Sequence, residues 1–173
     1  EDGVNYKLQG FLFPSTYEFY ADATAEEIIE KMLSEFDKRY KAAGGKPEDV
    51  YDVIIKASLI EREAKLDSER PTIAGVIENR LEVGMPLQID AGAQYVVSDG
   101  EFDVVVNRED LKVDSGYNTY KNKGLPIGPI CNPGSSSIEA AINPEKHDYL
   151  YYRTTEKGDG SHRFSVTYDE HLG

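Results

Sequence analysis

The sequence predicts an α+β domain, with a helical catalytic core followed by a smaller β portion that ends in a C-terminal hairpin. Apolar residues recur at helical spacing through the first half of the chain. Turn residues become frequent from Ser98 to Pro133, and two short runs around a glycine-containing turn close the chain. With 173 residues, of which 39% are hydrophobic, the chain is long enough for one domain with a core.

Three helices are expected in the first part of the chain. Thr24 and Glu27 form a capping box at the start of the first helix, and the Gly44-Gly45 pair ends it. The second helix is expected to begin near Pro47, because proline suits the first turn of a helix. The third is expected to begin near Ser68.

Two short helices and a hairpin are expected in the remainder. Asp90 is predicted to cap a helix over residues 91–97. Ser136 and Glu139 form a second capping box, which predicts another helix there. The two strands and the turn of the hairpin are expected over residues 149–155, 162–167 and 158–160.

The charge of the chain excludes some classes of partner. Acidic residues outnumber basic ones by 32 to 19, and the formal net charge of −13 repels a phosphate backbone. Nucleic acid and an anionic membrane surface are therefore not expected as partners. A neutral ligand remains open, and the 12 tyrosines offer flat faces for stacking on sugars, or pack in the core and rim.

Neither a metal nor a cofactor is predicted. The single cysteine, Cys131, cannot form a disulfide within the chain, and nothing indicates a lysine-centred pyridoxal phosphate site. The histidines are too scattered in sequence to predict a metal site: His147, His162 and His171. No run approaches the roughly 18 apolar residues of a membrane span. Because the chain starts abruptly at Glu1-Asp2-Gly3, we expect a domain boundary there, with an anchor or export signal cut away.

The second helix carries two carboxylates in unusual places. Successive residues rotate by about 100°, so Glu61 falls within one apolar stripe and Glu63 extends a second stripe on the other side. A helix that is apolar on both sides is normally buried, and burial turns a glutamate into a general acid. Alternatively, one or both reach solvent or pair with an arginine: Arg62, Arg70 or Arg80. Periodicity does not choose between the two glutamates.

A series of short motifs covers nearly the whole chain, and their order and spacing are specific although each alone is weak. The motifs are GFLFPSTY (10–17), ASLIERE (57–63), ENRL (78–81), LQID (87–90), YNTY (117–120), GLPIGPI (124–130), NPG (132–134), YLY (149–151) and HRF (162–164). With these motifs the chain resembles the MltG/YceG-like endolytic murein transglycosylases.

The resemblance implies an endolytic enzyme that cleaves peptidoglycan glycan strands between N-acetylmuramic acid and N-acetylglucosamine. It implies that Glu63, the second glutamate of its motif, is the catalytic acid, whereas Glu61 supports the site or the fold. A lytic transglycosylase uses the C6 hydroxyl of its own muramic acid as nucleophile. One carboxyl group can therefore act first as acid and then as base, leaving a 1,6-anhydro end.

The resemblance also implies where the protein works. Family members are usually anchored to the cytoplasmic membrane, with the catalytic part on the outer face and a LysM-like region before it. Residues 1–173 are therefore expected to be a single catalytic domain that lacks both. Peptidoglycan strands are the expected substrate, and wall-synthesis (penicillin-binding) proteins are the expected protein partners.

Polar groups of the matched motifs suit hydrogen bonds to N-acetyl and hydroxyl groups. The predicted substrate-binding residues are Glu61, Gln88, Asp90, Asn118, Thr119, Tyr120 and Asn132. Loop architecture is the alternative, with Asp90 as a helix cap and Asn118 and Asn132 as turn formers. The chain departs from the family pattern at Ala91-Gly92-Ala93, Gly116 and Cys131, none of which is the proposed acid.

Two rival functions remain at this point. In a hydrolytic muramidase, Glu63 would be the acid and Asp90 or Glu61 would activate water, so the products would carry reducing ends. A non-catalytic glycan-binding or scaffold module for wall-synthesis enzymes would keep its function without the glutamate.

Overall fold

The computed structural model describes residues 3–102 and 104–173, and the boundary predicted at Glu1-Asp2 lies outside them. These residues form six α-helices and one two-stranded antiparallel sheet, which confirms the predicted α+β class. Within the same ranges, no helix has the length and apolar character needed to cross a membrane. That the chain is a single catalytic domain stays a prediction.

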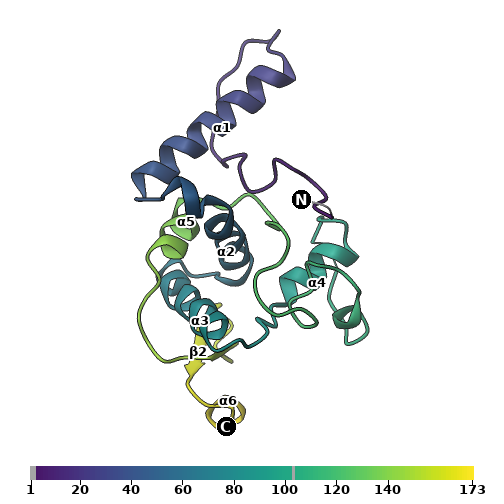
Figure 1. Cartoon of the computed structure of the whole chain (residues 1–173), viewed down its shortest axis with the longest axis vertical. Helices are drawn as coiled ribbons and strands as arrows, with labels where there is room; N and C mark the ends of the chain where they lie inside the picture. The colour runs from purple at the N-terminus through teal and green to yellow at the C-terminus, as the bar shows by residue number, and fades with distance from the viewer. Residues whose placement is uncertain (1–2, 103) are drawn as a thin grey trace.

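The first helix projects from a central group of helices, and the last helix lies at the opposite end of the molecule, against the hairpin (Figure 1). The α-helices are α1 (Ala25–Ala42), α2 (Val50–Glu63), α3 (Arg70–Glu82), α4 (Asp90–Val97), α5 (Ser135–Ile142) and α6 (Tyr168–Leu172). Short 3-10 turns precede α2 and α3 and lie after α4: Pro47–Asp49, Asp67–Glu69 and Asp110–Lys112.

Helix α2 lies at the centre of the core and packs against α3, α4 and α5. Residues 53–55 and 57–60, which include both apolar stripes beyond the first turn, are buried, and Ile54, Leu59 and Ile60 have no exposed surface. Burial of each such side chain contributes about 1.5–3 kcal/mol to the free energy of unfolding. This confirms the predicted buried helix, and it fixes the orientation of the last turn, which carries Glu61 and Glu63.

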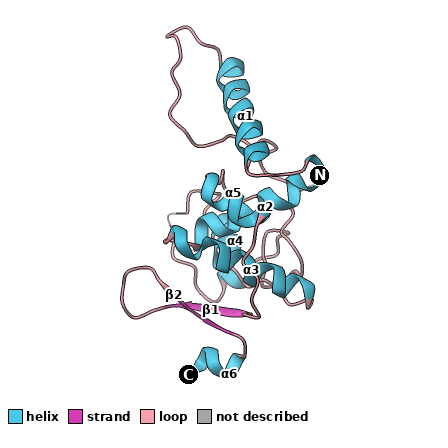
Figure 2. Cartoon of the chain, turned by 90° about the vertical axis from the view of Figure 1, so that its left-hand side faces the viewer, coloured by secondary structure: helices cyan, strands magenta, loops and turns pink. Residues whose placement is uncertain are grey.

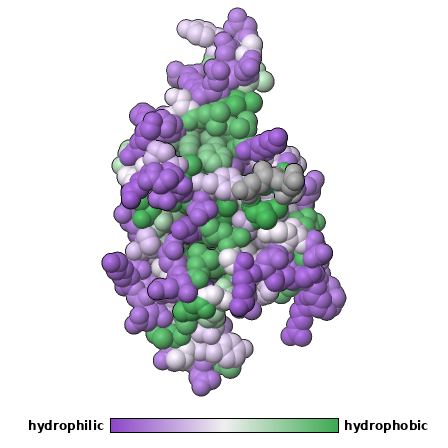
Figure 3. All heavy atoms as spheres, in the orientation of Figure 1, coloured by the Kyte–Doolittle hydropathy of each residue, from purple (hydrophilic) through white to green (hydrophobic). Residues whose placement is uncertain are grey.

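Helix α1 projects from the body (Figures 1 and 2). It starts at the predicted capping box, in which the Thr24 hydroxyl accepts a hydrogen bond from the Glu27 backbone N–H. Only Phe36 and Tyr40, towards its C-terminal end, are buried. Figure 3 shows an apolar area below the projecting tip, so the helix is held to the body mainly by its second half.

The predicted hairpin forms from strands β1 (Tyr151–Thr154) and β2 (His162–Ser165), which lie beside α3 (Figures 1 and 2). The paired residues are Tyr151 with Ser165, Tyr152 with Phe164, Arg153 with Arg163, and Thr154 with His162. Gly160 in the turn has a φ of 83°, and a Cβ there would lie 2.3 Å from the Lys65 side chain. The turn therefore needs glycine.

Two predicted helix caps are wrong. Helix α5 starts at Ser135 without a side-chain cap, because Glu61 from α2 accepts hydrogen bonds at this helix end, which replaces the predicted Ser136–Glu139 box. Helix α4 includes Asp90 as its first residue, and the carboxylate of Asp90 accepts a hydrogen bond from Tyr120 instead of capping the helix. In both cases a contact from a distant segment replaces the local one.

Candidate active site

A pocket of about 310 Å³ lies where the C-terminal end of α2 meets α3, the start of α4, the 117–120 loop and the hairpin. Its lining is mostly polar and carries both signs of charge. The lining residues are Glu63, Arg80, Leu87, Gln88, Asp90, Tyr120, Tyr152, Arg153, Thr154 and His162. The predicted acid therefore shares one pocket with three of the predicted substrate-binding residues, Gln88, Asp90 and Tyr120.

Glu63 is the last residue of α2, and its carboxyl group points into this pocket. The Tyr152 hydroxyl donates a hydrogen bond of 2.8 Å to its Oε2. Burial raises the pKa of Glu63 above its ordinary value, and the negative charge of Asp90 raises it further. The Tyr152 hydrogen bond and the charges of His162 and Arg62 lower this pKa, but the burial effect is larger. Glu63 therefore keeps its proton to higher pH than an ordinary glutamate, as a general acid requires.

Tyr152 keeps its proton and donates a hydrogen bond to Glu63. Burial raises its pKa well above the ordinary value, and the neighbouring Glu63 adds to the effect. Its ring meets the His162 ring edge-on, with the ring centroids 5.4 Å apart, and it also lies beside Phe164. A tyrosine that keeps its proton and packs between two rings is well placed to donate, and its hydrogen bond orients the carboxyl group of Glu63.

Glu61 lies outside this pocket and is occupied elsewhere. Its Oε2 accepts hydrogen bonds from the backbone N–H of Gly134 at 3.0 Å and from the Ser137 hydroxyl at 2.8 Å. Arg70 lies 3.4 Å from the same oxygen. These contacts join α2 to α5 and to the start of α3. Of the alternatives that the sequence left open for Glu61, the structure shows the ion pair with Arg70.

Asp90 and Tyr120 form a hydrogen-bonded pair on the pocket wall. The Tyr120 hydroxyl donates to Asp90 Oδ1 at 2.5 Å, and burial followed by this hydrogen bond raises the pKa of Tyr120. Gln88 stands next to them with a left-handed backbone (φ 53°). Its backbone N–H donates to the carbonyl oxygen of Thr119, which joins the two loops that carry these side chains.

Besides Glu61, three more of the predicted substrate-binding residues do not line the pocket. Asn118 and Thr119 are fully buried, and their side chains hydrogen-bond the backbone of residues 111–113 and of Ile89. Asn132 accepts hydrogen bonds from two backbone N–H groups of the N-terminal segment and lines a separate hollow of about 500 Å³. These contacts hold the shape of the loops around the pocket.

His162 also lines the pocket. From the sequence, this histidine was tested only as a possible metal ligand, and no other role was predicted for it. Its Nδ1 lies 2.7 Å from Glu69 Oε2, and its backbone N–H donates to Glu69 Oε1 at 3.0 Å. The side chain is only 6% exposed. No described residue makes a hydrogen bond to its Nε2, so this nitrogen is available to a ligand in the pocket.

Arg80 and Tyr152 were also missed as site residues. The Arg80 guanidinium donates to the carbonyl oxygens of Leu150 and Leu87, both at 2.6 Å, and so fixes the hairpin and the LQID loop on α3. Burial lowers the pKa of Arg80 from its ordinary value. One signal in the sequence could have found Tyr152 and His162. Side chains alternate between the two faces of a hairpin, and this alternation places both residues on one face.

Among the described residues, no group of histidine, cysteine and carboxylate side chains is arranged to hold a metal ion. The fold and the pocket thus define an α+β protein in which Glu63, a half-buried acid with a raised pKa, lines a polar pocket. A model of the YceG-like family matches residues 1–173, and the chain therefore belongs to the YceG-like family.

Named relatives and a solved structure agree with this assignment. The chain is 42% identical over 173 residues to the endolytic murein transglycosylase of Bacillus subtilis, covering 97% of this chain and 47% of that protein. It is 38% identical over 163 residues to that of Streptococcus pneumoniae serotype 2, covering 88% of this chain and 29% of that protein. A crystal structure of a yceG-like protein from Listeria monocytogenes matches with a TM-score of 0.89 and 42% identity, over 99% of this chain and 57% of the other. The chain spans less than half the length of the two named relatives.

Proposed function

We propose that this domain is an endolytic lytic transglycosylase that cleaves the β-1,4 bond between N-acetylmuramic acid and N-acetylglucosamine in peptidoglycan. The observation that carries the proposal is the half-buried carboxyl group of Glu63, whose pKa burial raises, in a pocket lined by hydrogen-bonding side chains. The relatives' name, endolytic murein transglycosylase, supports the choice of substrate.

In the proposed reaction, Glu63 acts first as acid and then as base. Its proton goes to the glycosidic oxygen as the bond from that oxygen to C1 of the muramic acid breaks. The C6 hydroxyl of the same muramic acid then forms the new bond to C1, and its proton returns to Glu63. Because the nucleophile belongs to the substrate, proximity replaces a second catalytic residue. The product ends in 1,6-anhydro-muramic acid.

The other pocket residues stabilise and position the sugar in this proposal. Asp90 places negative charge opposite the positive charge that develops on the ring, and the hydrogen bond from Tyr120 keeps its carboxylate in place. Gln88 and His162 Nε2 hydrogen-bond the N-acetyl and hydroxyl groups of the substrate. Glu61 has no contact with the sugar and acts through the fold.

A hydrolytic muramidase is the second candidate, and the shared pocket of Glu63 and Asp90 favours it. In that reaction Asp90 would activate a water molecule, which would attack C1 and leave a reducing end. Glu61 is not a candidate for this role because its carboxylate lies at the start of α5.

Purified peptidoglycan should be digested with the unmutated domain, with Glu63→Gln and with the surface control Glu82→Gln, and the fragments identified by mass spectrometry. Internal fragments with anhydro ends, from the unmutated and control domains only, are expected. Reducing ends would select the muramidase. Fragments from Glu63→Gln would remove Glu63 from the mechanism, and binding without fragments from any variant would select a glycan-binding or scaffold module.

The resemblance to the family also supports a proposal for where in the cell the whole protein works. In this proposal the whole protein is anchored to the cytoplasmic membrane and works on its outer face, where peptidoglycan strands are made, together with penicillin-binding proteins. Crosslinking in cells that produce the whole protein, followed by identification of the linked wall-synthesis enzymes, tests this part separately.

A further inference from the structure

A second hollow of about 610 Å³ lies along the hairpin and adjoins the catalytic pocket. Its lining residues are Arg153, Thr154, Thr155, Glu156, Lys157 and Arg163. Arg153 and Thr154 line both hollows, so the two hollows meet at this part of β1.

The charge of this hollow is opposite to that of the molecule. The chain carries a formal net charge of −13, yet three cationic side chains and only one carboxylate, that of Glu156, line this hollow. None of the ion pairs in the described part of the chain includes Arg153, Lys157 or Arg163. Asp159 in the turn is close enough for Lys157 to lower its pKa, but it is fully exposed. The positive charge of the hollow is therefore largely uncompensated.

The register of the hairpin increases the repulsion in this hollow. Arg153 and Arg163 are directly paired across the two strands, so their side chains leave the same face of the ribbon. Like charges opposite one another destabilise a strand pair. An anion bound between the two guanidinium groups would remove this repulsion, and arginine binds carboxylates through two parallel hydrogen bonds.

We propose that this hollow, here named the stem site, binds the carboxylate groups of the peptide stem attached to muramic acid, so that the enzyme prefers strands that carry stems. The proposal rests on the proposed function, which places muramic acid beside Glu63. The stem leaves that sugar through its lactyl group, and it carries free carboxylates on its side chains and at its end. Arg153 and Thr154 line both hollows, so a stem that leaves the sugar past β1 would reach the cationic side chains of the stem site.

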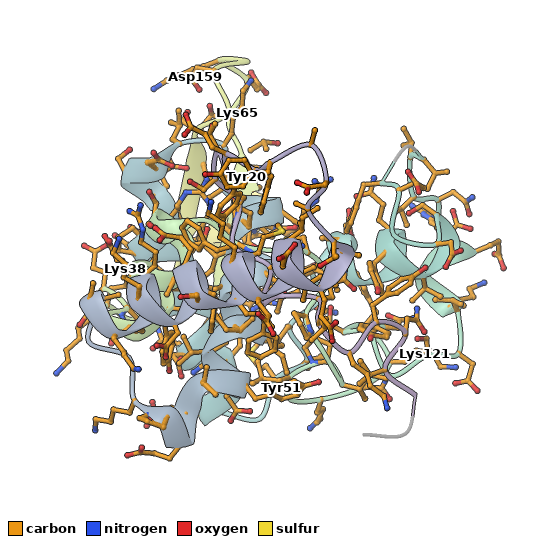
Figure 4. The ribbon with its side chains drawn as sticks, turned by 90° about the horizontal axis from the view of Figure 1, so that it is seen from above. Tyr20, Lys38, Tyr51, Lys65, Lys121 and Asp159 are labelled. Carbon is orange, nitrogen blue, oxygen red and sulfur yellow. The ribbon has the colours of Figure 1, made fainter. Side chains whose placement is uncertain are left out.

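The test compares glycan strands that carry stems with strands from which an amidase has removed them. The variants are Lys157→Gln with Arg163→Gln, which line the stem site and not the catalytic pocket. The matched control is Lys112→Gln with Lys121→Gln, which removes the same charge from an exposed loop. Figure 4 shows Lys121 far from Asp159 at the hairpin turn. The measured quantity is the ratio of kcat/KM on the two substrates.

The unmutated domain and the control are expected to prefer stem-bearing strands by about tenfold or more at low salt, as two guanidinium–carboxylate contacts allow. The stem-site variant is expected to lose this preference. Because the contacts are exposed, raising the salt concentration should also weaken it in the unmutated domain.

The remaining outcomes would contradict either the stem site or the proposed function, and the experiment distinguishes the two. A ratio near one for the unmutated domain, or an unchanged ratio in the variant, would remove the stem site and leave the proposed function standing. Inhibition by a phosphodiester polymer but not by free stem peptide would make it a phosphate site. Cleavage of neither substrate by any variant would instead refute the proposed function.

Binding provides a second readout that does not depend on cleavage. Free stem peptide should bind Glu63→Gln, measured by calorimetry, and should bind at least about tenfold more weakly when Lys157→Gln and Arg163→Gln are added. Equal binding by both proteins, with unchanged melting temperatures, would contradict the stem site.

Discussion

The two sides of the last turn of α2 hold carboxylates in opposite surroundings. On the side that faces α5, Glu61 has two hydrogen-bond donors and a neighbouring guanidinium, that of Arg70. On the side that faces the hairpin, Glu63 has one donor, Tyr152, and burial is the main influence on its pKa. The comparison teaches that the supply of donors, together with burial, separates a carboxylate that joins helices from one whose pKa is raised, as the proposed acid requires.

The largest expected effect is that of Glu63→Gln, which removes the proposed proton donor and keeps the shape of the side chain. We expect the rate of glycan cleavage to fall by about 10³-fold or more, within the range for loss of a general acid. Fragment release followed over time, beside Glu82→Gln, measures it.

The same variant also tests the burial of Glu63. A raised pKa stabilises the fold below the ordinary pKa of glutamate, and this contribution is lost as the pH rises through the folded-state value. The glutamine variant should therefore gain stability relative to the unmutated chain as the pH is raised. Urea unfolding at pH 4 and at about pH 8 checks this, and an equal difference at both would contradict a raised pKa.

Glu61→Gln should have its main effect on folding. It weakens the contacts of Gly134, Ser137 and Arg70, and we expect the free energy of unfolding to fall by about 1–2 kcal/mol, because the side chain is 31% exposed. Urea unfolding measures the loss, with cleavage per folded molecule as the companion measurement. A 10³-fold loss of cleavage with unchanged stability would reverse the roles of the two glutamates.

Tyr152→Phe should change the pH dependence of cleavage. The hydrogen bond from Tyr152 lowers the pKa of Glu63, so its removal raises that pKa further. An acid must be protonated to act, so the alkaline limb of the pH–rate profile should move to higher pH. The maximal rate should fall by about tenfold or less, because the carboxyl group loses its orientation. A shift to lower pH would show that Tyr152 does not donate to Glu63.

Asp90→Asn should also move the alkaline limb of the pH–rate profile, in the direction opposite to Tyr152→Phe and by a smaller amount. The negative charge of Asp90 raises the pKa of Glu63, but it stands behind burial and the Tyr152 hydrogen bond among the influences. The limb should therefore move to lower pH. If Asp90→Asn and Tyr152→Phe shifted the profile in the same direction, the electrostatic description of the pocket would be wrong.

Periodicity and turn chemistry predicted helices α1 to α5 and the hairpin, because these patterns depend on neighbours in sequence. Helix α6 was missed, although Thr167 and Glu170 form a capping box at its start. The two wrong helix caps occur where a residue distant in sequence makes the hydrogen bond that replaces the predicted local cap. Glu61 comes from α2 and accepts hydrogen bonds from the first turn of α5, where a Ser136–Glu139 box was predicted. Asp90 similarly pairs with Tyr120 from a later loop.

The site was predicted only in part, for the same reason. Gln88, Asp90 and Tyr120 lie with Glu63, whereas Asn118 and Thr119 lie within the loop. A polar residue in a motif is suited both to a ligand and to a backbone hydrogen bond, and only the fold distinguishes the two. The partners of Glu63 and His162 lie tens of residues away in sequence, as the contact with Tyr152 shows, and no pattern in one sequence reports such contacts.

The position of the two glutamates relative to helix ends has an electrostatic consequence. Aligned peptide dipoles give a helix about half a negative charge at its C-terminus and half a positive charge at its N-terminus. Glu63 is the final residue of α2, where this macrodipole opposes a carboxylate, whereas the Glu61 carboxylate meets the N-terminus of α5, where a macrodipole favours it. The backbone of two helices thus adds to the separation of the two roles, and no side-chain substitution would remove that contribution.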